Sequence, residues 1–104
     1  MPDWMIKIEK VNDPTADQRI VFDPDALDAF VGDIINWHNS DGASHWPAPL
    51  DQDGTFDPRK KEAWMDFAIP AGASSKQAHS PADTGVEHYC CALHPKERGR
   101  INVS

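Results

Sequence analysis

The residues best suited to chemistry lie near the C-terminus, where Cys91 and His94 are spaced C-x-x-H at the end of an expected strand. A thiolate and an imidazole at this spacing can face one ion across a tight turn, and together they favour copper, zinc or iron. Two ligands are too few for a metal site. A third candidate is His45, which lies in the loop 40–49 after another expected strand.

Two imidazoles and one thiolate form the trigonal plane of a blue-copper centre. Structural zinc usually takes four ligands in two close pairs, and the sequence has no second Cys/His pair at that spacing. We therefore expect His45, Cys91 and His94 to bind one copper ion. A nucleophilic Cys/His enzyme would also need an orienting group and an oxyanion hole, and the sequence offers no candidate for either.

The adjacent Cys90 needs a separate explanation. Neighbouring cysteines seldom form a disulfide, because Cα atoms about 3.8 Å apart are closer than disulfide geometry prefers. Strand alternation points Cys90 to the face opposite Cys91. We expect it to be a core or half-buried thiol.

The elements that must position these residues are short strands. Nine Pro and six Gly punctuate the 104-residue chain. Many short strands with turn signals between them predict an all-β sandwich or barrel, and the length fits a single domain, 1–104. The segment 25–31 could form one or two turns of helix before Gly32. The expected strands are 4–11, 19–22, 33–39, 63–69, 85–91 and 99–103.

Charge and hydropathy restrict the partners. The formal net charge is −7, from 17 acidic and 10 basic residues. Nucleic-acid binding needs clustered Lys and Arg, so we expect none, whereas an acidic surface favours basic partners. No apolar run approaches the ~20 residues of a membrane-spanning helix, and the N-terminus has no recognisable signal peptide.

Two blocks of the sequence resemble the plastocyanin and amicyanin branch of the cupredoxin family. The first contains F-x-P-x-x-L at 22–27 and G-D-x-x-x-W-x-N at 32–39, followed by a short polar turn that ends at His45. The second, 85–103, matches the family pattern around C-x-x-H-P and continues to G-x-I-x-V. Both blocks keep register without a gap, and the resemblance extends from Phe22 to the end.

The resemblance implies a Greek-key β-sandwich of the cupredoxin type with copper at His45, Cys91 and His94. It implies one-electron transfer to a redox partner protein, which the acidic surface leads us to expect is basic. It also implies a periplasmic or other extracytoplasmic location. We expect a monomer and no catalytic residues.

The chain departs from the family pattern at the axial methionine position, which holds Glu97. Glu97 either binds copper, which would favour Cu(II) and lower the reduction potential, or turns outward and leaves the axial position open. An open, red-copper-like site suggests an alternative function, a copper enzyme or a sensor of a small molecule such as nitric oxide. A copper carrier or store without a redox cycle is a third possibility.

Other residues have expected supporting or surface roles. Asn39 can hold the His45 loop through side-chain hydrogen bonds, the kind of support that metal ligands need. Trp46, beside His45, can shield the site, face a partner or pack in the loop. Outside the site we expect His38, His79 and His88.

Overall fold

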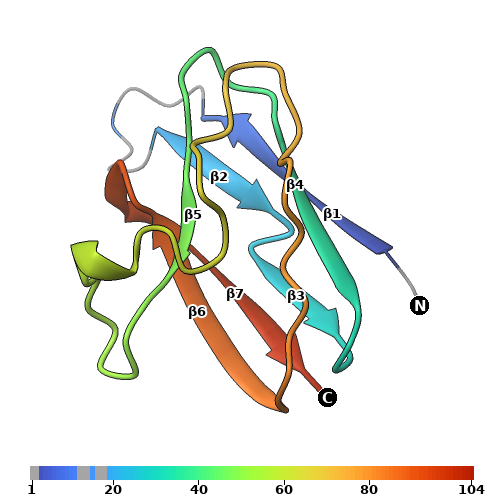
Figure 1. Ribbon diagram of the computed structural model, residues 1–104. Coiled ribbons are helices and arrows are strands. Elements are labelled where there is room, and N and C mark those ends of the chain that lie inside the picture. The colour runs from blue at the N-terminus through green and yellow to red at the C-terminus, as the bar shows by residue number, and fades with distance from the viewer. Residues whose placement is uncertain (1–2, 12–14, 16–18) are drawn as a thin grey trace.

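The computed structural model describes residues 3–11, 15 and 19–104, and within these ranges it contains two β-sheets (Figure 1). The first sheet contains, in spatial order, β2 (Ile20–Asp23), β1 (Asp3–Lys10) and β4 (Ile34–Asn39). The second contains β3 (Ala26–Ala29), β7 (His94–Val103), β6 (Gly85–Cys91) and β5 (Pro47–Pro49). One short 3-10 helix, η1 (Pro58–Lys60), interrupts the long connection between β5 and β6.

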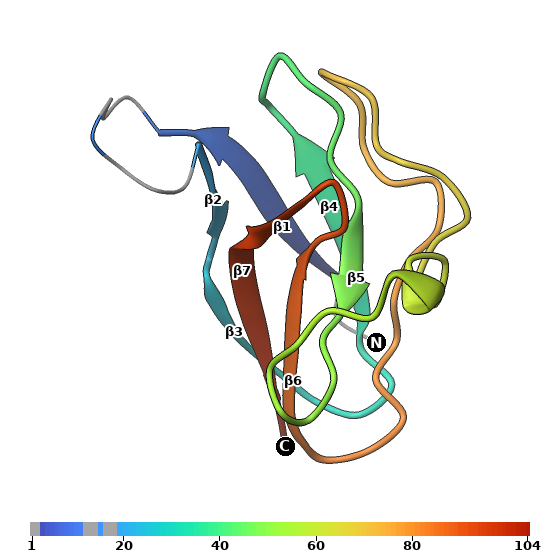
Figure 2. The same ribbon diagram turned by 90° about the vertical axis from the view of Figure 1, so that its left-hand side faces the viewer.

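The strand pairing is mixed, which is why strands distant in sequence become neighbours. β1 pairs antiparallel with β2 and parallel with β4, while β7 pairs antiparallel with β6 and parallel with β3. β2 and β3 follow each other closely along the chain but belong to different sheets, so this short link crosses from one layer to the other (Figure 2). The expected all-β sandwich is confirmed.

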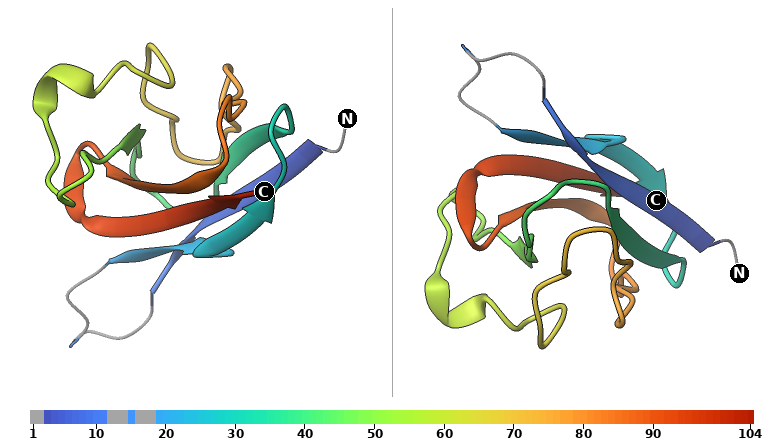
Figure 3. Two further views of the ribbon diagram at one scale, coloured as in Figure 1. Left: turned by 90° about the horizontal axis from the view of Figure 1, so that it is seen from below. Right: turned by 90° about the horizontal axis from the view of Figure 1, so that it is seen from above.

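The core lies between the two layers, which are separated when the molecule is seen end-on (Figure 3). Alternation along the strands decides what enters it. In β4, Ile35 and Trp37 are fully buried, and in β1 the same holds for Ile6 and Ile8. No helix in the described part of the chain is long and apolar enough to cross a membrane.

Two expectations about the elements were wrong. The segment 25–31 does not form a turn of helix, because Ala26–Ala29 pairs in parallel with the end of β7 and forms β3. The segment 63–69 is not a strand. Met65 and Ile69 are buried, but Phe67, which has the same strand parity, is 73% exposed. Only Ile69 pairs with another segment in strand fashion, through an isolated bridge to His45.

Candidate metal centre

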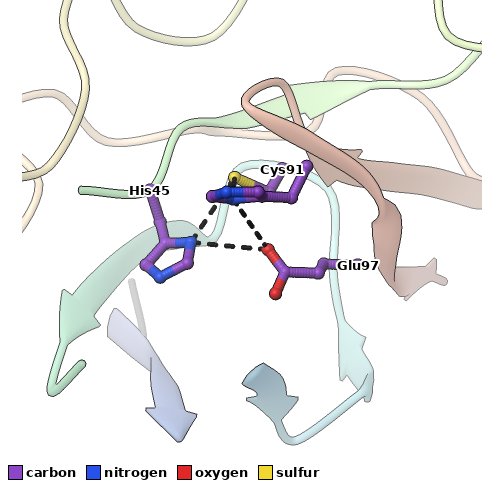
Figure 4. Close-up of side chains that lie close together, drawn as sticks. His45, Cys91 and Glu97 are labelled. Atoms are coloured by element: carbon purple, nitrogen blue, oxygen red, sulfur yellow. Dashed lines mark hydrogen bonds and ion pairs between the residues drawn. The ribbon is translucent and has the colours of Figure 1, made fainter. Parts of the chain in front are cut away.

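Three separate segments of the chain bring the candidate ligands together. His45 lies in the loop between β4 and β5, Cys91 ends β6, and His94 and Glu97 belong to β7. Their potential ligand atoms all lie within 4.8 Å of one another. Figure 4 shows His45, Cys91 and Glu97 pointing toward a common centre.

The distances inside this cluster fit a coordination sphere. Cys91 Sγ lies 3.5 Å from His45 Nδ1 and 3.8 Å from His94 Nδ1. Metal–sulfur and metal–nitrogen bonds of about 2.3 and 2.0 Å, at tetrahedral to trigonal angles, would separate the two donor atoms by about 3.5–3.7 Å. The two imidazoles and the thiolate are therefore spaced as they would be around one ion.

Glu97 supplies a further oxygen atom. Its Oε1 lies 3.2 Å from His94 Nδ1 and 3.5 Å from His45 Nδ1, yet among the described residues it has no hydrogen-bond partner of acceptable geometry. Glu97 is only 3% exposed. A buried, unpaired carboxylate oxygen is costly, and a cation at the centre of the cluster would remove that cost.

The site is closed on most sides. Cys91 is 0% exposed and His45 is 1% exposed, whereas the His94 side chain is 47% exposed. Glu97 is held from behind, since its Oε2 accepts a hydrogen bond of 3.1 Å from the backbone N–H of Ile20 in β2. His94 is therefore the member of the cluster that offers an edge to solvent.

The orientation of His45 is set by its neighbours. Asp41 Oδ2 lies 2.7 Å from His45 Nε2, which leaves Nδ1 for the cluster. The backbone of His45 also exchanges two hydrogen bonds with Ile69, of 3.1 and 2.7 Å. Such contacts fix the ring and its tautomer, as the surroundings of a metal-binding histidine usually do.

The loop that carries His45 is held by Asn39, as expected. Asn39 Nδ2 donates hydrogen bonds to the carbonyls of Ala43 and Ile69, at 2.7 and 3.0 Å. Its Oδ1 accepts a hydrogen bond of 2.9 Å from the backbone N–H of Asp41. One buried amide therefore positions both Asp41 and the segment that bridges to His45.

The electrostatics of the cluster favour positive charge. Burial opposes protonation of His45, but hydrogen bonds to Cys91 and Asp41 and the charges of Cys91 and Glu97 outweigh it and raise the pKa of His45 to about 9. Burial, the larger cause, and the neighbouring Cys91 raise the pKa of Cys90 to about 11. Cys90 is thus a buried thiol, as expected, and Cys91 is the cysteine in the cluster.

The other histidines and Trp46 lie outside the cluster. His38 contacts Ser74, His79 contacts Glu87, and His88 is exposed. Trp46 packs in the loop, since its indole N–H donates to the carbonyl of Met65 at 3.1 Å. Its backbone N–H points to Cys91 Sγ at 3.4 Å.

Sequence reasoning missed this backbone donor and the contact of Asp41. The only signal for Asp41 is its place four residues before His45 in the polar turn. A backbone donor such as the N–H of Trp46 cannot be recognised from the type of residue that carries it.

Comparison with solved structures identifies the class: the chain has the cupredoxin fold. A purple cupredoxin from Nitrosopumilus maritimus is 24% identical over 98% of this chain and 100% of its own, with a TM-score of 0.78. Amicyanin from Paracoccus versutus (Thiobacillus versutus) is 17% identical over 98% of this chain and 81% of its own, with a TM-score of 0.69. A Cu(I) form of an amicyanin mutant is 16% identical over 100% and 84%, with a TM-score of 0.66. No family model and no curated protein matches the sequence.

Proposed function

We propose that this chain is a mononuclear copper protein that carries one electron, with the ion held by His45, Cys91 and His94 and by Glu97 as a fourth ligand. The observation that carries the proposal is the convergence of two imidazoles, a thiolate and a buried carboxylate within 4.8 Å. The fold is shared with solved cupredoxins, one of them an amicyanin in its Cu(I) form. A donor set of this softness suits copper.

Copper, when bound, supplies a one-electron couple between Cu(I) and Cu(II). The contribution of the protein is to keep the ligands in one arrangement through the cycle. Cys91 and His94 are paired across the β6–β7 hairpin, and His45 is held by Asp41 and Ile69. Ligands fixed in this way need little rearrangement when an electron arrives or leaves.

The exposed edge of His94 gives the electron a route to the surface, because the other three side chains of the cluster are buried. A redox partner would dock over this edge. As the family resemblance implies, we propose that the chain works as a single-domain monomer in a periplasmic or other extracytoplasmic compartment.

The alternative, an enzyme or sensor that reacts with a small molecule at an open copper, has less support. In its open form it requires Glu97 to turn outward, and this carboxylate is buried, directed into the cluster and anchored on the backbone of Ile20. A copper store without a redox cycle would not need ligands that stay in one arrangement. The store hypothesis therefore gives no reason for the fixed positions of these ligands.

The test is to load the purified chain with Cu(II) and to record its optical and EPR spectra with a metal analysis. We expect one copper per chain and an intense thiolate-to-copper charge-transfer band. Cys91→Ser should abolish this band and leave the fold intact by circular dichroism. Cys90→Ser is the matched control, since it changes the neighbouring cysteine outside the cluster and should keep the band.

Three results would contradict the proposal. A charge-transfer band that survives Cys91→Ser would show that a group other than Cys91 gives rise to it. Failure of the chain to hold Cu(II) would favour the store. A weakly coloured copper that binds azide would favour the open, reactive site.

A further inference from the structure

A hollow beside the exposed edge of His94 is lined by exposed side chains of positive charge, whereas the chain as a whole has a negative net charge. It measures about 290 Å³ and is lined by Arg19, His94, Pro95, Lys96 and Glu97. Glu97 is buried, and its oxygens face the cluster and the N–H of Ile20. Among the described residues that line this hollow, the exposed charged side chains, Arg19 and Lys96, are both positive.

Arg98 adds a third positive charge, on the same strand as Lys96. Its Nε donates to the carbonyl of Pro95 at 3.2 Å, and one terminal nitrogen donates to the carbonyl of Gly54 at 2.8 Å. These two contacts hold the guanidinium beside the residues that line the hollow. Neither partner is a carboxylate, so neither contact neutralises the charge of Arg98.

Three of the described carboxylates are either paired or distant from His94. Asp51 and Asp57 form ion pairs with Lys60 and Arg59. At the far end of the sandwich, Asp28 lies opposite Asn102, near the last residues of β7. His94 is the first residue of the same strand. The pairing places His94 opposite Cys91 and Asn102 opposite Val86, and five residues of strand span about 16 Å.

Distance decides which charges a docking partner meets. The Debye length is about 8 Å at physiological ionic strength, so a carboxylate about two such lengths away, such as that of Asp28, is largely screened at the His94 edge. The net charge of −7 governs the field far from the molecule and at low salt. Among the described residues that line the hollow beside the exposed imidazole, the exposed charges are those of Arg19 and Lys96.

We propose that the face around the exposed edge of His94 docks an acidic redox partner, whose carboxylates meet Arg19, Lys96 and Arg98. The inference rests on the proposed electron-transfer function. It replaces the expectation of a basic partner, which was drawn from the net charge alone. Exposed Leu93 and Pro95 supply apolar surface beside these cations, and the hollow has room for a carboxylate side chain between them.

The first experiment measures the local charge with small oxidants of opposite sign. Reduced, copper-loaded protein is mixed with hexacyanoferrate(III) or with tris(phenanthroline)cobalt(III); one electron leaves Cu(I), and Fe(III) or Co(III) is reduced to Fe(II) or Co(II). We expect the rate with the anionic oxidant to fall as salt is raised, and the rate with the cationic oxidant to rise. A field set by the net charge would give the reverse pattern and would overturn the inference.

Charge-reversal variants localise the effect. Arg19→Glu combined with Lys96→Glu should lower the rate with hexacyanoferrate(III) at low salt by about 10-fold and reverse the salt dependence. Lys7→Glu is the matched control, because Lys7 is an exposed residue of β1 in the other sheet. An equal loss of rate per reversed charge in this control would also overturn the inference.

A second experiment tests whether the occupant is a macromolecule. Poly-L-glutamate should slow the reaction with hexacyanoferrate(III) in the parent protein and have little effect on the double variant. Competition by poly-L-lysine instead would mean a basic partner. If the small anion responds as expected but poly-L-glutamate does not compete, the hollow takes only small anions and the docking inference is wrong.

These outcomes are separable from failure of the proposed function. A chain that holds no copper, or whose copper reacts with neither oxidant, would disprove electron transfer itself. A chain that reacts with both oxidants but shows the salt dependence of its net charge would disprove only the acidic-partner inference.

Discussion

At the scale of single residues, Glu97 has two oxygens with different surroundings. Oε2 accepts from the backbone of Ile20, while Oε1 faces His45 and His94 without a hydrogen bond of its own in the described chain. The first contact prevents the side chain from turning outward. A carboxylate held in this position adds a negative charge beside the proposed ion, where a methionine would add none.

Glu97→Gln should therefore raise the reduction potential of the copper-loaded protein. A unit charge about 4 Å away contributes a few kcal/mol at an effective dielectric constant of about 20, which corresponds to a rise on the order of 100 mV for a one-electron couple. Glu97→Met should also raise it and move the colour toward blue. Protein-film voltammetry measures the potential.

Glu87→Gln is the control, since Glu87 pairs with His79 away from the cluster. It should leave the potential nearly unchanged. If neither Glu97 variant changed the potential or the spectrum, Glu97 would not touch the metal.

At the scale of elements, the β6–β7 hairpin carries Cys91 and His94, and its packing depends on a glycine. Gly99 lies opposite Tyr89 in the pairing, and a Cβ built at Gly99 would come within 2.5 Å of the Tyr89 ring and hydroxyl. Tyr89 is fully buried and packs edge-on against Phe22 and Trp37. The ring therefore has little freedom to move aside.

Gly99→Ala should destabilise the fold by about 1–3 kcal/mol, the usual cost of overpacking. Urea unfolding followed by tryptophan fluorescence measures the change. Gly42→Ala is the matched control, because nothing lies within 4 Å of a Cβ placed there. A Gly99 variant as stable as the Gly42 variant would mean that the hairpin can adjust its register.

Asp33 connects β1 to the turn before β4, and this connection should depend on pH. Its carboxylate accepts hydrogen bonds from the Trp4 indole and from the Phe30 backbone, both at 2.9 Å, and these lower the pKa of Asp33. A lowered native pKa means that this stabilisation is complete above the unfolded-state value of about 3.9 and is lost as the pH falls below it.

Asp33→Asn should therefore lower the free energy of unfolding at neutral pH and flatten its decline between about pH 4 and pH 2. Urea titrations across this range measure both. Asp83→Asn, which changes an exposed carboxylate, should keep the slope of the parent protein. An unchanged slope in the Asp33 variant would contradict the assignment.

At the scale of the whole molecule, the candidate site brings together separate segments of the chain. His45 lies in the loop after β4 of the first sheet, whereas Cys91 and His94 belong to the second. An ion bound by all three would tie the His45 loop to the β6–β7 hairpin. Binding should stabilise the folded state as well as supply the redox couple.

Zn(II), a redox-inert substitute, should raise the melting temperature and a chelator should reverse the rise. At 100 times the dissociation constant, binding adds about 2.7 kcal/mol, which for a domain of this size corresponds to roughly 10–20 °C. Differential scanning calorimetry measures the shift. Cys91→Ser should remove most of it and Cys90→Ser should not; equal shifts in both would place the metal elsewhere.

Features that depend on local spacing could be predicted from the residues alone. Short apolar runs between turn residues predicted β1, β2, β4 and β6. The C-x-x-H spacing predicted that Cys91 and His94 can face one ion across a tight turn. His45, in a loop after an expected strand, completed the expected set of three ligands, and the resemblance to cupredoxins added the position of Glu97. Asn39 was also expected to hold the loop, and its hydrogen bonds do so.

Features that depend on partners far along the chain could not be predicted from local patterns. Cys91 and His45 are 46 residues apart, and no local pattern brings them within 3.5 Å. The segment 25–31 is compatible with a helical turn. It contains β3 only because β7, about seventy residues later, pairs with it. The anchoring of Glu97 on Ile20 spans 77 residues. Long-range packing decides which strand edges are available for pairing, which carboxylates are buried and which charges are exposed. Residue types alone do not encode that packing.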